Sequence, residues 1–337
     1  MDAIILVGGL GTRLRPLTET RHKSLVPICN RPAIDFLLEW LARHGVRRAV
    51  LAVGGGGEEL AAHVRAPGVA PLPVTFVWER LRLESGGAIR NAVREARIEE
   101  RFLVVNGDVY VEFSLRDAVE FHVQRGAELT LALCRVADPS EFGVALVSDE
   151  GWVTGFVEKP PRGAYENALV NAGVWIFERH LVDQIPNGPV RVEETLFPSL
   201  VARGRPVLGY TFEGEWADIG TPSRYLDLHR RLLSRGPGVL LGEECEVAPD
   251  ARLELAAIGP RCRIGPGAAV REAVLWEDVS VAAGAVVEGS VLANGVEVGA
   301  DARVRNSVLG AGAVVLPGAV IEGTKLAPGA RYDGPHG

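Results

Sequence analysis

The chain carries two different patterns of hydrophobic positions, which meet near residue 236. In the first, short apolar runs typical of buried strands alternate with helix-like segments, such as Ile34, Leu37, Leu38 and Leu41, with Gly45 suited to the cap that follows. Strands are predicted at Ala3–Val7, Ala49–Val53, Phe102–Asn106, Leu129–Arg135, Val144–Val147, Val153–Val157 and Gly173–Phe177, and further helices at Leu115–Arg125 and Pro222–Leu233. This alternation predicts a layered α/β domain with a largely parallel sheet over residues 1–235.

Residues 239–330 follow a hexapeptide pattern instead. Aliphatic residues recur in steps of six, six and five that repeat every 17 residues, with Gly, Pro, Asn and Asp between them. These positions are Val247, Leu253, Ile258, Ile264, Val270, Leu275, Val281, Val287, Leu292, Val298, Val304, Leu309, Val315, Ile321 and Leu326. The period predicts a β-helix coiled as a triangular prism, in which each aliphatic side chain stacks on its counterpart one coil away. We place the domain boundary at Gly236-Pro237-Gly238.

The same period predicts that Cys245 and Cys262, which are 17 residues apart, stack on adjacent coils. A coil spacing of about 4.8 Å lies within the Cα separation that a disulfide tolerates. Two free thiols are the favoured alternative, because the four cysteines show neither a CxxC motif nor zinc-like spacing and no secretory leader is apparent. The Gly- and Pro-rich tail Ala327–Gly337 is a candidate cap for one end of the β-helix.

Composition narrows the range of partners. The formal net charge is −7 and no basic run occurs, which disfavours a nucleic acid or a membrane surface as a partner. Neither a signal peptide nor a membrane-spanning stretch is apparent, so we expect a cytoplasmic protein with reduced thiols. Only three lysines occur, Lys23, Lys159 and Lys325, which suggests that a retained lysine marks a position requiring a compact ammonium group.

A glycine-rich turn, Gly8-Gly9-Leu10-Gly11-Thr12-Arg13, follows the first predicted strand. Ligands of α/β sheets bind at such turns, where glycine lets backbone N–H groups surround a phosphate. The dinucleotide motif is excluded because Leu14 stands where it needs glycine, and the P-loop is excluded because no Gly-Lys-Ser/Thr closes the turn. Arg13 and, further on, Lys23 supply the cations that a polyphosphate requires.

Acidic residues lie at the ends of three other predicted elements. Asp108 comes just after the strand Phe102–Asn106, and Asp218 lies before the helix that Thr221 and Pro222 begin. Carboxylates in such positions suit Mg²⁺, which prefers one or two of them together with phosphate oxygens. Glu158-Lys159 ends another strand, where the carboxylate can accept sugar hydroxyls and the lysine can reach a phosphate.

Taken together, these motifs resemble the nucleotidyltransferase family that makes nucleotide sugars. The matching segments are Gly8–Thr18 with Lys23, Asp108, Glu158–Pro160, Asn171–Gly173 and Trp216–Pro222, and many members of this family carry a C-terminal left-handed β-helix. The resemblance implies a Rossmann-like α/β domain with a mostly parallel mixed sheet, followed by a left-handed parallel β-helix. The segments RVEETLFPSLVARG and WADIGTPSRYLDLHRRL resemble the mannose-1-phosphate guanylyltransferase group most closely.

The resemblance also implies roles for individual residues. Catalysis falls to Arg13, Lys23, Asp108 and Asp218, the last two holding Mg²⁺. The nucleotide is bound by Leu6, Gly8, Gly9, Gly11, Thr12, Glu84 and Gly87, and the sugar phosphate by Gly143, Glu158, Lys159 and Asn171. The expected substrates are a nucleoside triphosphate and a hexose 1-phosphate, and a homo-oligomer is expected. The anionic sugar phosphate then displaces pyrophosphate at the α-phosphorus, which needs no general base.

The identity of the base stays open at this point. The segment Leu81–Ala88 aligns with the base-reading loop of the family, and Glu84 stands where the family commonly has glycine. Its carboxylate can accept the N1–H and amino donors of guanine, or it can face solvent. A GDP-mannose-forming enzyme is favoured, and a UDP- or dTDP-glucose-type pyrophosphorylase and a catalytically inactive regulatory homologue are the alternatives. An acyltransferase activity of the β-helix is disfavoured, because His336 is the only histidine after His229. Gly54–Gly57 is interpreted as a strand-to-helix connection rather than a phosphate loop.

Overall fold

The computed structural model describes residues 1–334 and divides into two compact units. Unit 1 contains Met1–Gly9 and Ile34–Trp216. Unit 2 contains Leu10–Ala33 together with the chain from Ala217 onward. The glycine-rich turn is therefore divided after Gly9, and its second half clusters with the C-terminal part of the chain.

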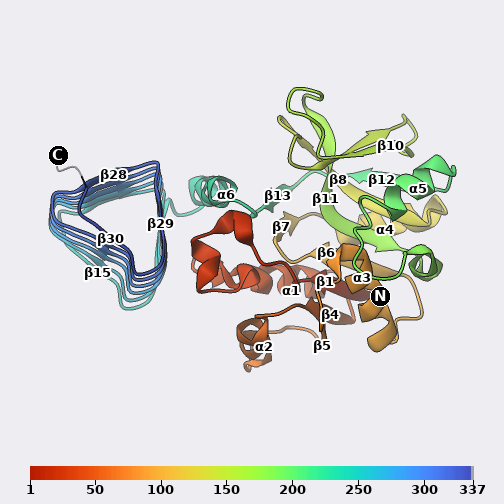
Figure 1. Cartoon of the computed structure of the whole chain (residues 1–337), viewed down its shortest axis with the longest axis horizontal. Helices are drawn as coiled ribbons and strands as arrows, with labels where there is room; N and C mark the ends of the chain where they lie inside the picture. The colour runs from red at the N-terminus through yellow and green to blue at the C-terminus, as the bar shows by residue number, and fades with distance from the viewer. Residues whose placement is uncertain (335–337) are drawn as a thin grey trace. The chain divides into compact units, whose positions relative to one another are not determined.

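Unit 1 is built on a nine-stranded mixed sheet whose main path is β10-β9-β11-β6-β1-β4-β5, with β8 pairing both β11 and β12 (Figure 1). Its strands are β1 (Asp2–Leu6), β4 (Arg48–Val53), β5 (Val74–Trp78), β6 (Phe102–Asn106), β8 (Leu129–Val136), β9 (Gly143–Val147), β10 (Val153–Glu158), β11 (Ala168–Phe177) and β12 (Val207–Thr211). The strands β6, β1, β4 and β5 run parallel, whereas β11 is antiparallel to β6, β8 and β9. The predicted mixed α/β sheet is confirmed.

Helices complete unit 1 and bury the apolar faces of the sheet. They are α1 (Ala33–Arg43), α2 (Glu58–Arg65), α3 (Glu84–Glu95), α4 (Leu115–Gln124), the 3-10 helix η4 (Arg179–Gln184) and α5 (Leu196–Ala202). The core contains fully buried aromatic side chains, with Phe197 packed edge-on against Trp175 at a centroid distance of 5.2 Å. A two-stranded sheet joins β7 (Val109–Glu112) to β13 (Glu215–Asp218).

Helix α3 was not predicted, and its residues 84–88 fall within Leu81–Ala88, the segment expected to be the base-reading loop. Gly86 and Gly87 lie in its first turn, and glycine disfavours helix. Close packing accounts for both residues, since a Cβ on Gly86 would lie 2.9 Å from the Val190 side chain and one on Gly87 2.6 Å from the Gly188 carbonyl. Tertiary contact outweighs local propensity here.

The N-terminal segment of unit 2 is compact. It contains the 3-10 helices η1 (Thr12–Leu14), η2 (Leu17–Glu19) and η3 (Lys23–Leu25) and the short strands β2 (Pro27–Ile28) and β3 (Arg31–Pro32). Helix α6 (Pro222–Arg235) begins as predicted, because Thr221 Oγ1 accepts the N–H of Arg224 and proline occupies the first turn. It ends before the predicted Gly-Pro-Gly boundary.

The rest of unit 2 forms three stacked parallel sheets, typical of a left-handed β-helix (Figure 1). The first sheet is β14 (Val239–Leu241), β17 (Ala256–Ile258), β20 (Val274–Leu275), β23 (Val291–Leu292), β26 (Val308–Leu309) and β29 (Lys325–Leu326). The second is β15 (Glu246–Val247), β18 (Arg263–Ile264), β21 (Ser280–Val281), β24 (Glu297–Val298), β27 (Val314–Val315) and β30 (Arg331–Tyr332). The third is β16 (Arg252–Glu254), β19 (Ala269–Arg271), β22 (Val286–Glu288), β25 (Arg303–Arg305) and β28 (Val320–Glu322).

The predicted inward stacking is confirmed. Val247 pairs with Ile264, which pairs with Val281, and the aliphatic positions form or line one apolar core. Burying each such side chain contributes roughly 1.5–3 kcal/mol, so the repeated stack accounts for most of the stability of this region. Tyr332 packs against the last coil, and its hydroxyl donates to the Val320 carbonyl over 3.2 Å. His336 lies outside the described residues.

Cys245 and Cys262 lie on adjacent coils as predicted, because Glu246, which follows Cys245, donates its N–H to the Cys262 carbonyl. Both are free thiols, and each donates to a backbone carbonyl 14 residues further on, at 3.0 Å for Cys245 and 2.9 Å for Cys262. Burial raises the pKa of Cys262 to about 12, which keeps its thiol protonated.

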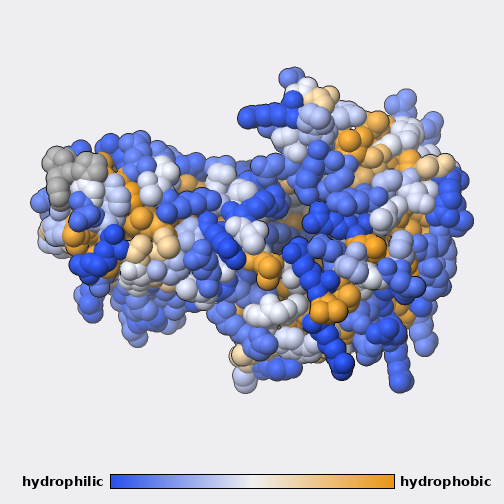
Figure 2. Space-filling view, viewed as in Figure 1, coloured by the Kyte–Doolittle hydropathy of each residue, from blue (hydrophilic) through white to orange (hydrophobic). Residues whose placement is uncertain are grey.

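The surface visible in Figure 2 is mostly hydrophilic, with apolar residues in small, separate groups. Through residue 334, every helix falls short of the length and apolar character needed to cross a bilayer.

Candidate active site

In unit 1, the start of the predicted glycine turn and Asp108 both lie at the carboxyl-terminal edge of the sheet. Strands β1 and β6 are parallel neighbours, with Leu6 opposite Asn106, and Gly107 donates its N–H to the Leu6 carbonyl over 2.9 Å. Gly8 and Asp108 each come two residues after these paired strand ends. Since the carboxyl ends of parallel strands are where α/β sheets bind ligands, this edge is the expected position for a nucleotide.

The Gly8 turn is packed closely against a second glycine turn. A Cβ on Gly54 would lie 2.9 Å from the Gly8 carbonyl oxygen, so only glycine permits this approach. Gly54–Gly57 joins β4 to α2, which confirms the strand-to-helix connection.

Glu79 was missed by the sequence analysis. It directly follows β5, and its Oε2 accepts the N–H of Leu83 over 3.1 Å. A Cβ on Gly8 would lie 3.4 Å from its Oε1, so its carboxylate borders the glycine turn. Burial raises the pKa of the Glu79 carboxyl above its usual value. Its position after a parallel strand was the available signal, since β5 ends at the same edge as β4 and β1.

Three of the predicted sugar-phosphate residues lie side by side on the antiparallel strands. Glu158 at the end of β10 pairs with Gly143 at the start of β9. Val144 pairs with Val170 on β11, so Gly143 and Asn171 are the next positions along these two strands. Lys159 follows with its Nζ 3.3 Å from Oε1 of Glu158. The sheet register thus places a carboxylate, an amide and an ammonium group in one small region.

The amide of Asn171 is oriented by the strand that carries it. Its Oδ1 accepts the N–H of Gly173 at 3.0 Å and the indole N–H of Trp175 at 2.6 Å. Gly173 has φ +73°, and a Cβ there would lie 2.6 Å from Nδ2 of Asn106. Because Oδ1 already has two donors, Asn171 would contact a sugar through its Nδ2 hydrogens.

A second carboxyl group, Glu193, faces the same region and was also missed. Ser85 Oγ donates to its Oε2 over 2.5 Å and in turn accepts the N–H of Val192 at 3.1 Å. Burial raises the pKa of Glu193, and the carboxylate of Glu158 acts in the same direction. Glu193 belongs to the segment RVEETLFPSLVARG, which the sequence analysis matched to a family without assigning a role to this residue.

The two base-reading candidates, Glu84 and Gly87, lie in the first turn of α3 rather than in a loop. Glu84 bridges two arginines, with Oε1 2.9 Å from Nε of Arg82 and Oε2 3.2 Å from Nε of Arg191. Gly87 is buried against the Gly188 carbonyl. Only Leu81–Leu83 of the expected loop Leu81–Ala88 lie outside a helix, because residues 84–88 begin α3 and pack on the segment that carries Glu193.

In unit 2, the turn residues Gly11 and Lys23 contact each other closely. Gly11 has φ +61°, and a Cβ there would lie 3.2 Å from the Cβ of Lys23. Thr18 Oγ1 donates to the Gly11 carbonyl over 2.8 Å, and Thr12 begins η1. These contacts fix the position of the Lys23 backbone, from which the side chain extends.

Arg13 and Asp218 also lie together in unit 2, 4.0 Å apart between Nη2 and Oδ2. Asp218 Oδ2 also accepts from Nη1 of Arg224 at 2.8 Å, and its Oδ1 accepts the N–H of Gly220 at 2.5 Å. A Cβ on Gly220 would lie 3.0 Å from Nη2 of Arg13, so this glycine leaves room for the arginine. Arg224 is not among the predicted site residues.

Two family models together match almost the whole chain. The model described as "Nucleotidyl transferase" matches residues 2–235, and that described as "GMPPB C-terminal domain" matches residues 235–331. The chain belongs to the nucleotidyl transferase family. As a member of this family it is an enzyme, and every site residue discussed above falls in the first matched range.

Relatives of this nucleotidyl transferase include a mannose-1-phosphate guanylyltransferase of Mycobacterium tuberculosis, which is 34% identical over 77% of this chain and 79% of its own length. The catalytic subunit beta of the Danio rerio mannose-1-phosphate guanylyltransferase is 36% identical over 67% of this chain and 63% of its own length. Among solved structures, HddC from Yersinia pseudotuberculosis complexed with GMP-PN is 25% identical, with a TM-score of 0.60, over 68% of this chain and 99% of that chain.

The residues of this transferase that would hold Mg²⁺ are divided between the units, Asp108 in unit 1 and Asp218 in unit 2. Within residues 1–334, no three His, Cys, Asp or Glu side chains group as a metal site. A magnesium site made of two carboxylates and phosphate oxygens would not form such a group. The pairing of Asp108 with Asp218 on one metal stays a prediction.

Proposed function

We propose that this nucleotidyl transferase joins GTP to mannose 1-phosphate, forming GDP-mannose and releasing pyrophosphate. The observation that carries the proposal is the arrangement of Glu158, Gly143 and Asn171 across three neighbouring strands, with Lys159 beside them. Carboxylate and amide groups suit sugar hydroxyls, and the ammonium group suits a monophosphate. The mannose-specific names of the relatives and the GMP-PN complex of a solved relative favour this sugar and this base.

In the proposed reaction, a phosphate oxygen of the sugar phosphate attacks the α-phosphorus of the nucleotide. The new P–O bond forms as the bond from the α-phosphorus to the bridging oxygen breaks, and that oxygen leaves with pyrophosphate. The nucleophile is already anionic, so the chain's residues act by positioning and by charge stabilisation. We assign the triphosphate to the Gly8–Gly11 turn, Arg13 and Lys23, and the sugar phosphate to Lys159.

The carboxylates fit the proposed magnesium ion. Asp218 accepts from Arg224 and from Gly220, and these two donors fix the orientation in which its carboxylate would meet the metal. Asp108 is half-buried at the ligand-binding edge of the sheet. Bound there with the triphosphate, Mg²⁺ would neutralise charge on the phosphate oxygens. Nη2 of Arg13 lies 4.0 Å from Oδ2 of Asp218, and its guanidinium would bind the same phosphates.

For the base, we propose that the Glu84 carboxylate binds guanine. Guanine presents two adjacent donors, N1–H and the exocyclic amino group, which a carboxylate can accept together. Arg82 and Arg191 pair with this carboxylate and fix its orientation at the start of α3. Uracil and thymine present only one such donor, so a carboxylate here would favour GTP over UTP or dTTP.

The test is a matrix of five nucleoside triphosphates against the 1-phosphates of mannose, glucose, galactose, N-acetylglucosamine and fucose, with released pyrophosphate measured. The highest kcat/KM is expected for GTP with mannose 1-phosphate. A preference for UTP or dTTP with glucose 1-phosphate would replace this assignment with the glucose-type reaction. Absence of turnover across the whole matrix would contradict nucleotidyl transfer to a sugar phosphate.

A further inference from the structure

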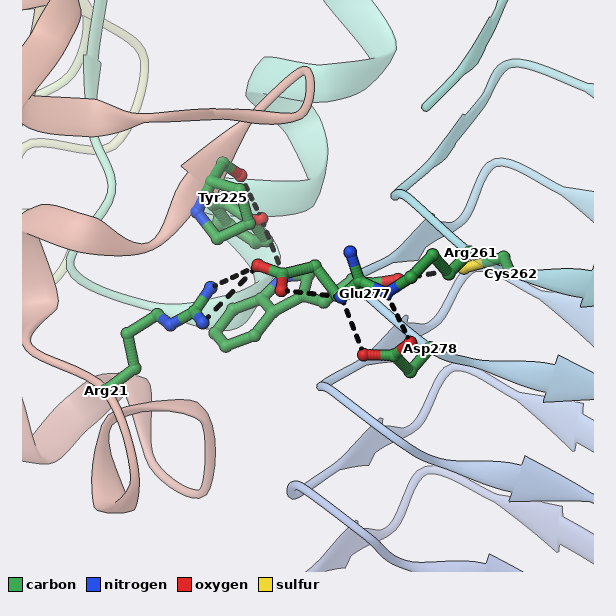
Figure 3. A network of polar contacts seen from close by, with 8 residues as sticks. Arg21, Tyr225, Arg261, Cys262, Glu277 and Asp278 are labelled. Atoms are coloured by element: carbon green, nitrogen blue, oxygen red, sulfur yellow. Dashed lines mark hydrogen bonds and ion pairs between the residues drawn. The ribbon is translucent and has the colours of Figure 1, made fainter. Parts of the chain in front are cut away.

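A polar contact ties the N-terminal segment of unit 2 to one turn of the β-helix. Arg21 directs its guanidinium at Glu277, whose Oε1 lies 3.4 Å from Nη1 and 3.5 Å from Nη2 (Figure 3). Glu277 belongs to the Trp276–Asp278 turn between β20 and β21, and 256 residues separate the two partners in the sequence. The same guanidinium lies over the Trp276 ring, 5.3 Å from its centroid. Arg21 therefore has both an ionic and an aromatic partner on one turn.

The acceptor is itself held in place by the β-helix. Oε2 of Glu277 accepts from Nη2 of Arg261 over 3.2 Å, and Arg261 is paired with Asp278 at 2.7 and 2.8 Å. Arg261 lies one coil before this turn, 17 residues from Asp278. The carboxylate that meets Arg21 is thus oriented by its neighbours on two coils (Figure 3). The side chain of Arg21 is only 19% exposed, so solvent screens the contact less than it would a fully exposed pair.

Trp276 also reaches the other end of η3 through helix α6. Its indole N–H donates to the Tyr225 hydroxyl over 3.1 Å, and that hydroxyl donates to the Pro27 carbonyl. Tyr225 is completely buried, and burial raises the pKa of its hydroxyl, which keeps it a donor. Trp276 consequently contacts Arg21, which lies two residues before Lys23. Through the Tyr225 hydroxyl it is also linked to Pro27, which lies four residues after Lys23.

Two further bonds fix the residues that follow. Asn30 Nδ2 donates to the Ile258 carbonyl of the β-helix over 2.7 Å, and the Cys29 N–H donates to Nε2 of His229 over 3.0 Å. On its other side, Lys23 is packed against Gly11. The backbone that carries Lys23 is therefore anchored before, beside and after this residue by groups of its own unit.

We propose that the Trp276–Asp278 turn is a positioning element of the active site, which sets the placement of Lys23, and with it the Gly11 turn, through Arg21 and Tyr225. The inference rests on the proposed function, in which Lys23 acts on the triphosphate. An ion pair of this kind contributes little to folding, whereas a displacement of about 1 Å in a catalytic group can lower a rate by roughly 100-fold. Turnover is therefore the sensitive measurement, and stability is not.

The test compares Glu277→Gln with Glu288→Gln. Glu288 is a matched control, since it lies on the same β-helix, is 48% exposed against 37% for Glu277, and pairs only with Arg305 among the ion pairs described, at 3.7 Å. Glu277→Gln is expected to lower kcat roughly tenfold, with KM for both substrates within about twofold and Tm within a few degrees of wild type. Glu288→Gln is expected to match wild type in all four quantities.

A double-mutant cycle with Arg21→Gln and Glu277→Gln separates positioning from general damage. Because both changes break one contact, the double variant should be no slower than the slower single variant, and Arg21→Lys should recover part of kcat. Hydrogen exchange should be faster at the amides of residues 20–30 in Glu277→Gln than in Glu288→Gln, and this measurement does not depend on turnover.

The outcomes separate the inference from the proposed function. A wild-type enzyme without turnover in the substrate matrix contradicts the proposed function, and the exchange comparison then decides whether the turn holds the segment. An active wild type with equal kcat in Glu277→Gln and Glu288→Gln, or with additive effects in the cycle, overturns the inference.

Discussion

Gly143 lies directly opposite Glu158 across β9 and β10, and a Cβ on Gly143 would lie 2.7 Å from Oε2 of that carboxylate. The same Cβ would also lie 2.5 Å from the Phe156 ring. Glycine at this position therefore determines where the Glu158 carboxylate can point. The relationship matters because Glu158 is the residue assigned to the sugar hydroxyls.

We predict that Gly143→Ala raises KM for the sugar phosphate about tenfold or more, since Glu158 must move away from the added methyl group, while KM for the nucleotide stays within about twofold. Gly155→Ala on β10 is the control, because its Cβ would meet only the flexible Leu146 side chain, at 3.0 Å. Steady-state kinetics with each substrate varied in turn checks this. A change in the nucleotide KM alone would contradict the assignment of Glu158.

Loss of either proposed magnesium carboxylate should affect the chemical step. Asp108→Asn and Asp218→Asn are each expected to lower kcat by at least about 100-fold, close to 3 kcal/mol of barrier. Asp183→Asn, an exposed carboxylate paired with Arg179, is the control and should keep wild-type kcat. If both active-site variants stay within about tenfold of wild type, the metal assignment is wrong.

Glu84 and Glu193 should affect different substrates. Glu84→Gln is expected to raise KM for GTP, because an acceptor for guanine is lost. The ratio of kcat/KM for GTP to that for UTP is expected to fall about tenfold. Glu193→Gln is expected to act on KM for the sugar phosphate instead, since this carboxyl group neighbours Glu158. Measuring both KM values for both variants distinguishes the two roles, and an unchanged GTP preference in Glu84→Gln refutes base reading by this residue.

The stability of the protein should depend on the protonation of His229. Its Nε2 accepts the Cys29 N–H at 3.0 Å, so Nδ1 carries the proton and donates to the Tyr225 carbonyl at 2.9 Å. Burial lowers the pKa of His229 from 6.5 to about 4. The unfolded chain thus binds a proton that the folded chain does not, and the free energy of unfolding falls as the pH decreases from 6.5 towards 4.

Between pH 7 and pH 5, this effect amounts to roughly 2 kcal/mol. Urea unfolding at both pH values should show a smaller loss of stability in His229→Gln, whose amide oxygen can still accept the Cys29 N–H. His122, whose pKa burial also lowers, is present in both proteins, so the difference between them isolates His229. An identical pH dependence in the two proteins would show that His229 is not the group responsible.

Local pattern was sufficient for the regular parts of this molecule. The β-helix was predicted with its inward residues, because each coil of 17 residues repeats one burial requirement and stacks on its neighbour. The strands β1, β4 and β6 were predicted because each is a short buried run of apolar residues. The candidate site motifs could be proposed from the sequence because phosphate, metal and sugar each require particular residue types.

Tertiary structure decided what depends on contacts between distant residues. Helix α3 was missed because Gly86 and Gly87 have poor helix propensity, and only their packing against Val190 and Gly188 explains them. The carboxyl groups of Glu79 and Glu193 belong to no motif with an assigned role, and sheet register and burial bring them to the site.

The grouping of the Leu10–Ala33 segment with the β-helix was also beyond the reach of sequence patterns. Arg21 and Glu277 are each ordinary charged residues in their own surroundings, and 256 positions separate them. Periodicity reports which face of a local element is buried, but it carries no information on which distant charge that face will meet. That choice is made only when the chain folds and the two groups lose part of their hydration together.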